Sequence, residues 1–183
     1  MSNALENRRQ AFAVWLIPEK KQATYLSGII TYFAQEYESP VFKPHCTLIS
    51  GKTADINAVK AIVAEVSRSV SKITMITADI TCTDFFFRAL AINLSVTSRL
   101  EQVFTGFRTA IPDNHSESLT PHISLLYKNL DESERAMLAD TEVPLDRITF
   151  DALKLVRPTD REREWYAVES WQTVSEHRLR NEL

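Results

Sequence analysis

The chain has 183 residues, of which 44% are hydrophobic and 25% are charged, with a net charge of −3 at pH 7. This composition is typical of a globular domain, and the small negative charge argues against a protein that coats long nucleic acid by bulk electrostatics. Three glycines are too few for a glycine-rich phosphate loop, and no apolar run approaches the roughly 20 residues that a membrane span needs.

The N-terminus and the cysteines indicate the compartment. The segment MSNALENRRQ lacks the apolar stretch of a signal peptide. Cys46 and Cys82 form neither a CxxC pair nor a cluster of metal ligands. We therefore expect both to be reduced core residues in a cytoplasmic protein. We further expect a monomer with no cofactor and no bound metal.

Strands and helices alternate in the first half of the chain. Residues 11–17 are short, apolar and closed by Pro18, which predicts a buried strand. Apolar residues then recur at helical spacing in two segments, the first of which is broken by Ser39-Pro40. The predicted elements after the first strand are a helix over 21–37, a strand over 42–49, a helix over 55–70, a strand from residue 73 and a strand over 85–96.

The second half repeats this order at an offset of 77 positions, so that His122 corresponds to His45 and Pro121 corresponds to Pro44. We interpret the pattern as an internal duplication with repeat units 11–83 and 85–174 inside one domain, 1–183. A pseudo-twofold axis between the units would bring the two histidine strands face to face across a cleft. The predicted elements of the second unit are a strand over 88–94, a helix over 98–114, strands over 119–126 and 148–156 with a helix over 131–143 between them, and a closing strand over 164–174.

The motif Pro-His-x-Ser/Thr occurs in both units, as KPHCTLIS and TPHISLLY. Residues i and i+2 of a strand point to the same face, so we expect His45 to project with Thr47, and His122 with Ser124. A single copy of so short a motif would carry little information, but two copies at equivalent positions favour a shared role. The two strands together would present two imidazoles and two hydroxyls to the cleft.

That set of groups suits the cleavage of a phosphodiester. One neutral histidine can take a proton from attacking water, and one protonated histidine can give a proton to the leaving ribose oxygen. The hydroxyls of Thr47 and Ser124 can hydrogen-bond the non-bridging phosphoryl oxygens. A cyclic phosphate is the easiest target because the leaving oxygen stays tethered. A serine nucleophile is disfavoured, because no orienting carboxylate is apparent for His122 and Ser124.

Other residues have weaker claims to a role. Tyr127 follows the second motif and could stack on a base or cap the cleft, although core packing is nearly as good an explanation. Trp15 could bind substrate, although tryptophans are more often core residues. Lys43 and Lys128 flank the motif strands and could add positive potential. We expect His115 and His177 to be solvated, because they lie in polar segments.

The paired His-x-Thr/Ser motifs, here HCT and HIS, resemble those of the two-histidine (2H) phosphoesterase superfamily. The segments AFAVWLIP, FKPHCTLISG and TPHISLLYKNL most resemble the branch that opens ADP-ribose 1″,2″-cyclic phosphate and nucleoside 2′,3′-cyclic phosphates. The resemblance implies a bilobal α+β fold with an antiparallel sheet in each lobe, a central cleft and metal-independent hydrolysis. It implies that His45 and His122 are catalytic, that Thr47 and Ser124 bind phosphate, and that Tyr127 flanks the substrate.

Two alternatives remain open. A sister branch of the superfamily, the RNA 2′,3′-cyclic phosphodiesterases or 2′-5′ RNA ligase-like proteins, would make RNA ends the partner. The net charge and the absence of Arg/Lys clusters beside the motifs argue mildly against that branch. A nucleotide-binding module without catalysis is the second alternative, and the four intact motif residues argue against it.

Overall fold

The computed structural model describes residues 9–112, 114–116, 118–158 and 171–181. Within them, seven antiparallel strands form one sheet with the path β2-β1-β6-β3-β4-β5, and β7 pairs with β6. The strands are β1 Gln10–Pro18, β2 Cys46–Thr53, β3 Ile73–Cys82, β4 Leu90–Leu94, β5 His122–Leu126, β6 Arg147–Pro158 and β7 Trp171–Arg178. The helices are α2 Lys20–Glu36, α3 Ile56–Ser69, α4 Ser98–Ala110, α5 Glu132–Leu138 and the 3-10 helix η1 Phe86–Arg88.

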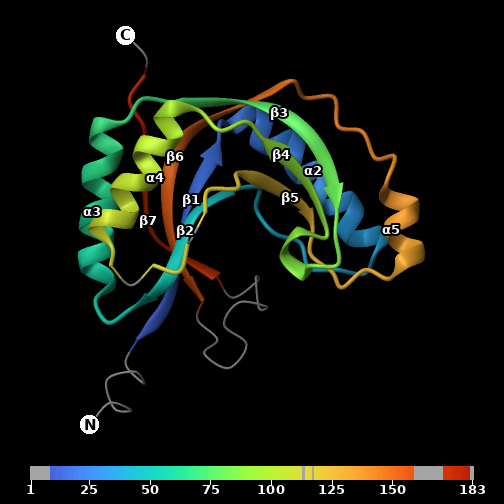
Figure 1. Cartoon of the computed structure of the whole chain (residues 1–183), viewed down its shortest axis with the longest axis horizontal. Helices are drawn as coiled ribbons and strands as arrows, with labels where there is room; N and C mark the ends of the chain where they lie inside the picture. The colour runs from blue at the N-terminus through green and yellow to red at the C-terminus, as the bar shows by residue number, and fades with distance from the viewer. Residues whose placement is uncertain (1–8, 113, 117, 159–170, 182–183) are drawn as a thin grey trace.

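The helices cover the sheet in two groups. Figure 1 shows α3 and α4 side by side at one end of the molecule, with α2 and α5 toward the other. Helix α3 packs on β6 and β7, α4 contacts β2, and α2 contacts β5. The first helix of each predicted unit therefore packs against the motif strand of the other unit, which ties the two halves together.

Helices α3, α4 and α5 begin where the sequence supplies a capping side chain, whereas α2 has none. Asp55 accepts hydrogen bonds from the backbone N–H groups of Asn57 and Ala58 and so satisfies two free donors at the start of α3. Helix α5 begins with a capping box, in which Asp131 and Glu134 each accept from the other's backbone N–H. Because these caps are local, the helix starts were predictable from sequence.

The order of the strands is symmetrical with respect to the predicted repeat. When β1, β2 and β3 are exchanged for β4, β5 and β6, the path β2-β1-β6-β3-β4-β5 maps onto itself. Strand β3 pairs with β4 and β6 pairs with β1, so β3 of the first unit extends the strands of the second, and β6 of the second extends those of the first. The α+β class is confirmed. A continuous sheet replaces the separate sheet that we expected in each lobe, because β3 also pairs with β6, and the duplication itself stays a prediction.

Several predicted boundaries were wrong. Residues 85–89 are not strand, because Thr83 holds a turn there: its hydroxyl donates to the Arg88 carbonyl and accepts from the Phe85 N–H. The motif strands begin at Cys46 and His122, after the prolines, which lack a backbone donor. The helices expected over 98–114 and 131–143 end at Ala110 and Leu138, and residues 164–170 of the closing strand lie outside the described residues.

The buried apolar side chains form a core between the sheet and its helices. Phe12, Phe107 and Phe150 are among the largest fully buried side chains. Both cysteines are free, but only Cys46 is fully buried, whereas Cys82 packs at the edge of the core. Among the described helices, none combines the length and the apolar character needed to cross a bilayer.

Candidate active site

A cleft of about 420 Å³ lies on the face of the sheet that carries the motif residues. Two histidines and two lysines line it, and the described lining residues include no aspartate or glutamate. Its aromatic lining comes from both halves of the fold. The lining residues are Ala13, Trp15, Val41, Phe42, Lys43, His45, Thr47, Ser50, Phe85, Phe87, His122, Tyr127, Lys154, Val156, Trp171 and Thr173.

The strand register builds the floor of this cleft. Trp15 of β1 pairs with Thr47 of β2 on one side and with Lys154 of β6 on the other. Lys154 pairs in turn with Glu176 of β7. Directly paired residues on neighbouring strands share a face, so these four side chains form one row across four strands. The next row consists of Ser50, Ala13, Val156 and Thr173.

His45 lies against aromatic side chains at the bottom of the cleft. Its ring stacks on Trp15, with centroids 3.8 Å apart and an interplanar angle of 15°. Its Nδ1–H donates to the Lys43 carbonyl at 2.7 Å, which leaves the Nε2 lone pair free to accept a proton. The Tyr127 hydroxyl lies 3.4 Å from Nε2, at the long limit of a hydrogen bond. Burial lowers the pKa of His45 to about 4, and the nearby positive charges of His122 and Lys154 act in the same direction.

His122 repeats this backbone arrangement in a more open setting. It is the first residue of β5, and its Nδ1–H donates to the Thr120 carbonyl at 2.8 Å. Its Nε2 is therefore also the nitrogen left for proton transfer. Burial lowers the pKa of His122 by less than that of His45, with a smaller contribution from the positive charge of Arg88. Each imidazole is thus fixed in the same tautomer by the carbonyl two residues before it.

The structure brings the two motifs together. His45 and His122 line the same cleft, and strands β2 and β5 contact each other. The thiol of Cys46 accepts a hydrogen bond from the backbone of His122, which connects the two motifs directly. Burial raises the pKa of this thiol to about 12, so it stays protonated and acts as a small core residue rather than a nucleophile.

The two motif hydroxyls are placed differently. Thr47 lines the cleft beside His45, as expected. Ser124 is buried and does not line the cleft, and its hydroxyl donates to the Phe87 carbonyl at 2.7 Å. Ser124 also acts on the Tyr127 side chain and lowers its pKa, against the larger effect of burial. The turn at η1 brings a backbone carbonyl within reach of Ser124, so the hydroxyl is engaged there, and its expected contact with phosphate stays a prediction.

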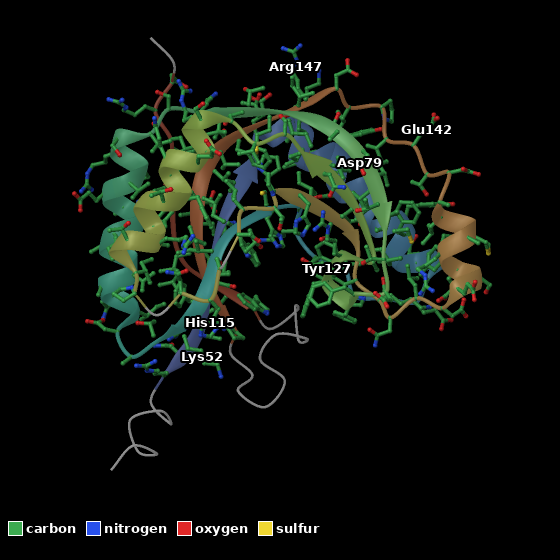
Figure 2. The ribbon with its side chains drawn as sticks, in the orientation of Figure 1. Lys52, Asp79, His115, Tyr127, Glu142 and Arg147 are labelled. Atoms are coloured by element: carbon green, nitrogen blue, oxygen red, sulfur yellow. The ribbon has the colours of Figure 1, made fainter. Side chains whose placement is uncertain are left out.

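Tyr127 and Trp15 both contact the candidate catalytic residues. Tyr127 is buried after β5 and stacks on Phe42 with centroids 3.7 Å apart, and burial raises its pKa. Figure 2 shows Tyr127 near the middle of the molecule, whereas Glu142 and Arg147 lie at its outer edge. Trp15 stacks on Trp171 as well as on His45. Phe85, 60% exposed, stands at the rim of the cleft.

The remaining candidate lysines and histidines differ in whether they line the cleft. Lys43 is exposed and lines the cleft. Lys128 instead donates to the Tyr37 carbonyl and pairs with Glu134, so it stabilises a loop. His115 is exposed, as expected. His177 was expected in a solvated tail but lies in β7, half-buried, because β7 extends to Arg178 along β6.

Sequence reasoning missed Lys154, which is buried in the floor of the cleft. The available signal was a lysine between apolar residues in the predicted strand ITFDALKLV. It also missed Phe42, Phe85 and Phe87 as lining residues, since aromatic side chains near a motif are usually core. Among the described residues, no group of three or more His, Cys, Asp or Glu side chains is placed to hold a metal ion.

Comparisons with known proteins agree with this geometry. The chain matches the family model described as cyclic phosphodiesterase-like protein over residues 10–176. The cyclic phosphodiesterase of Arabidopsis thaliana is 21% identical over 175 residues, covering 93% of this chain and 96% of that protein. Two solved structures share the fold: E. coli LigT complexed with 3′-AMP (TM-score 0.57, 15% identity, 95% and 99% of the two chains covered) and TT0787 of Thermus thermophilus (TM-score 0.63, 12% identity, 94% and 100% covered). The chain therefore belongs to the cyclic phosphodiesterase-like protein family, within the two-histidine phosphoesterase superfamily.

Proposed function

We propose that this protein is a phosphodiesterase that opens cyclic phosphates on ribose, with ADP-ribose 1″,2″-cyclic phosphate and nucleoside 2′,3′-cyclic phosphates as its substrates. One observation carries the proposal: two imidazoles from distant parts of the chain line one cleft, each with Nδ1 held by a backbone carbonyl. The lack of carboxylates among the described lining residues favours an anionic substrate.

The surroundings of the two histidines assign their roles. His45 has the lower pKa, about 4, so it is neutral in the free enzyme and suited to be the general base. His122, whose pKa is lowered less, is more readily protonated and suited to be the general acid. A bound phosphate anion raises both pKa values, which favours the protonated form of His122 where the proton is needed.

The reaction then proceeds in one displacement. His45 Nε2 takes a proton from water while the water oxygen attacks the phosphorus. The bond between phosphorus and one ribose oxygen breaks, and His122 Nε2 gives its proton to that oxygen. The products are a ribose hydroxyl and a phosphate monoester on the neighbouring ribose oxygen, and proton exchange with solvent resets the pair.

Two hydroxyls support the displacement in different ways. Thr47 is placed to donate a hydrogen bond to a phosphoryl oxygen as negative charge develops there. Tyr127 lies beside His45 Nε2 and, because burial raises its pKa, stays protonated and orients the imidazole and the water. Ser124 acts through Tyr127 and the Phe87 carbonyl rather than on the phosphate itself.

The aromatic lining supports a nucleotide as the substrate. Trp15 and Trp171 stack along one part of the cleft, while Phe42 and Tyr127 stack along another. Flat apolar surfaces of this kind hold a ribose and its base. E. coli LigT, which has a similar fold, has been solved in complex with 3′-AMP, and this supports a nucleotide as the ligand of the cleft.

A substrate panel tests the proposal. Purified protein is given adenosine 2′,3′-cyclic phosphate, ADP-ribose 1″,2″-cyclic phosphate and a short RNA that ends in a 2′,3′-cyclic phosphate, and the position of the product phosphate is determined by NMR. We expect turnover of the small substrates with the phosphate left on the 2′ or 1″ oxygen. A strong preference for the RNA would identify the sister branch instead, and tight binding without turnover between pH 4 and 8 would identify a binding module.

A further inference from the structure

Lys154 lies in the floor of the cleft, where its charge helps to lower the pKa of His45, but the proposed chemistry gives it no contact with the substrate. The residue is 8% exposed, and its Nζ lies 2.7 Å from a carboxylate oxygen of Glu176. An ammonium group has three donors. Within the described part of the chain, Glu176 is its one polar partner, so donors remain for a ligand in the cleft.

The backbone of Lys154 lies two strands away from that of Thr47, the predicted phosphate ligand. In the row across the sheet, Trp15 stands between Thr47 and Lys154, and the Trp15 ring covers His45. Neighbouring strands are about 4.8 Å apart, so the backbones of Thr47 and Lys154 are about 10 Å apart. A substrate whose cyclic phosphate lies at His45 and Thr47 therefore presents a more distant group to Lys154.

The charge that Lys154 presents to the cleft is positive. Glu176 is the next residue of the row, on the side of Lys154 away from Trp15, and is partly solvated there, so it holds the ammonium group from that side. The other lysine of the cleft, Lys43, stands exposed at the rim. A buried, fixed ammonium group among aromatic side chains suits a phosphate better than a neutral sugar or base.

We propose that Lys154 binds a second phosphate, the one attached to the 5-position oxygen of the ribose that carries the cyclic phosphate. This inference rests on the proposed function. A 5′-monophosphate, a diphosphate bridge and the preceding linkage of an RNA end all place a phosphate at this position, so the chemistry is shared by the three sources. Lys154 thus favours cyclic phosphates with this phosphate over simple nucleosides.

Calorimetry with the reaction products tests the inference without turnover. The ligands are adenosine 2′-monophosphate and adenosine 2′,5′-bisphosphate, and the proteins are wild type, Lys154→Met and Lys43→Met. We expect wild type to bind the bisphosphate roughly tenfold more tightly than the monophosphate. Lys154→Met should lose most of that preference, whereas Lys43→Met, which removes the same charge from the rim, should keep it.

Equal loss of preference in both variants would mean bulk electrostatics and would overturn the inference. So would a Lys154→Met protein that retains the preference, or one that weakens both ligands equally. Lys154→Arg should keep a large part of the preference, because the charge is retained. Glu176→Gln should also keep it, and a preference lost in Glu176→Gln with Lys154 intact would show that the ion pair, rather than the ammonium group, is responsible.

Kinetics separate the sources of the second phosphate and separate this inference from the proposed function. Adenosine 2′,3′-cyclic phosphate is compared with its 5′-phosphorylated form and with a dinucleotide that ends in the cyclic phosphate. We expect the 5′-phosphorylated form to have the higher kcat/KM, and the dinucleotide tests whether a diester suffices. If all three substrates are turned over with equal kcat/KM, the role of Lys154 is overturned and the proposed function stands. If none of them is turned over, the proposed function is overturned, and the binding preference measured by calorimetry is a separate result.

Discussion

The two copies of the Pro-His-x-Ser/Thr motif share their residue types but not their surroundings. In the first copy, His45 is buried under Trp15 and beside Tyr127, and its pKa falls to about 4. In the second copy, His122 is less buried and its pKa falls by less. Because the stacked indole removes water from only one of the two rings, the same backbone arrangement yields two different acid strengths.

The hydroxyls differ in the same way. Thr47 faces the cleft, whereas Ser124 donates to the Phe87 carbonyl beneath it. The comparison teaches that a repeated motif can supply matched geometry and still divide the labour, because packing around each copy sets its chemistry. The predictions that follow test whether the two copies are as unequal as their surroundings indicate.

The largest effect is expected from the histidines. His45→Ala and His122→Ala should each lower kcat by roughly 10²–10⁴-fold, because each removes one proton-transfer group. Initial rates on adenosine 2′,3′-cyclic phosphate measure the loss. His115→Ala is the matched control, since His115 is exposed and does not line the cleft, and it should stay at the wild-type rate. Wild-type activity in either cleft variant would show that the two motifs do not act together.

The motif hydroxyls should differ in importance. Thr47→Val should lower kcat by roughly 10²-fold, because it removes a donor to the developing charge on the phosphate. Ser124→Ala should cost roughly tenfold or less in kcat, since it affects the site through Tyr127. A thermal melt of each variant separates catalysis from folding. Equal losses of kcat from two folded variants would mean that both hydroxyls bind the phosphate, as the repeat alone predicts.

The indole over His45 should control the acidic limb of the pH profile. Trp15→Leu lets water reach the imidazole, so the pKa of His45 should rise from about 4 by about one pH unit or more. The acidic limb of kcat/KM should move to higher pH by the same amount. Trp171→Leu removes an indole that stacks on Trp15 rather than on His45, and it should leave that limb in place. No movement in Trp15→Leu would assign the limb to another group.

The smallest effect is expected from chelation. Excess EDTA should leave the rate on adenosine 2′,3′-cyclic phosphate unchanged, because the proposed proton transfers need only the two imidazoles. The rate is measured before and after dialysis against the chelator. A loss of activity that added zinc, manganese or magnesium restores would contradict the metal-independent reaction and would also remove the reason to distinguish the two histidines.

Many helices and strands of the fold could be predicted from the sequence, because the patterns that indicate them are local. Helical spacing and the short apolar strands both predicted elements that the structure contains. The motif residues His45, Thr47 and His122 were also recognisable, because a repeated histidine with a nearby hydroxyl is unusual. The family follows from the same short segments and is confirmed by the match over residues 10–176.

The rest depends on which strands meet, and no short pattern shows that. Lys154 becomes part of the cleft only because β6 pairs with β1 and places it beside Trp15. The Ser124 hydroxyl is hydrogen-bonded to the backbone only because the turn after β3 directs the Phe87 carbonyl toward it. The unequal pKa values of His45 and His122 likewise arise from packing between distant segments.

The pH dependence of kcat/KM in the two histidine variants tests the division of labour most directly. In wild type the profile should be a bell whose acidic limb lies near pH 4 and whose basic limb lies below the ordinary histidine range, because His45 must be neutral and His122 protonated. Residual hydrolysis of adenosine 2′,3′-cyclic phosphate by His45→Ala should lose the acidic limb, and that by His122→Ala should lose the basic limb. The opposite assignment of limbs, or a bell retained in both variants, would contradict the account.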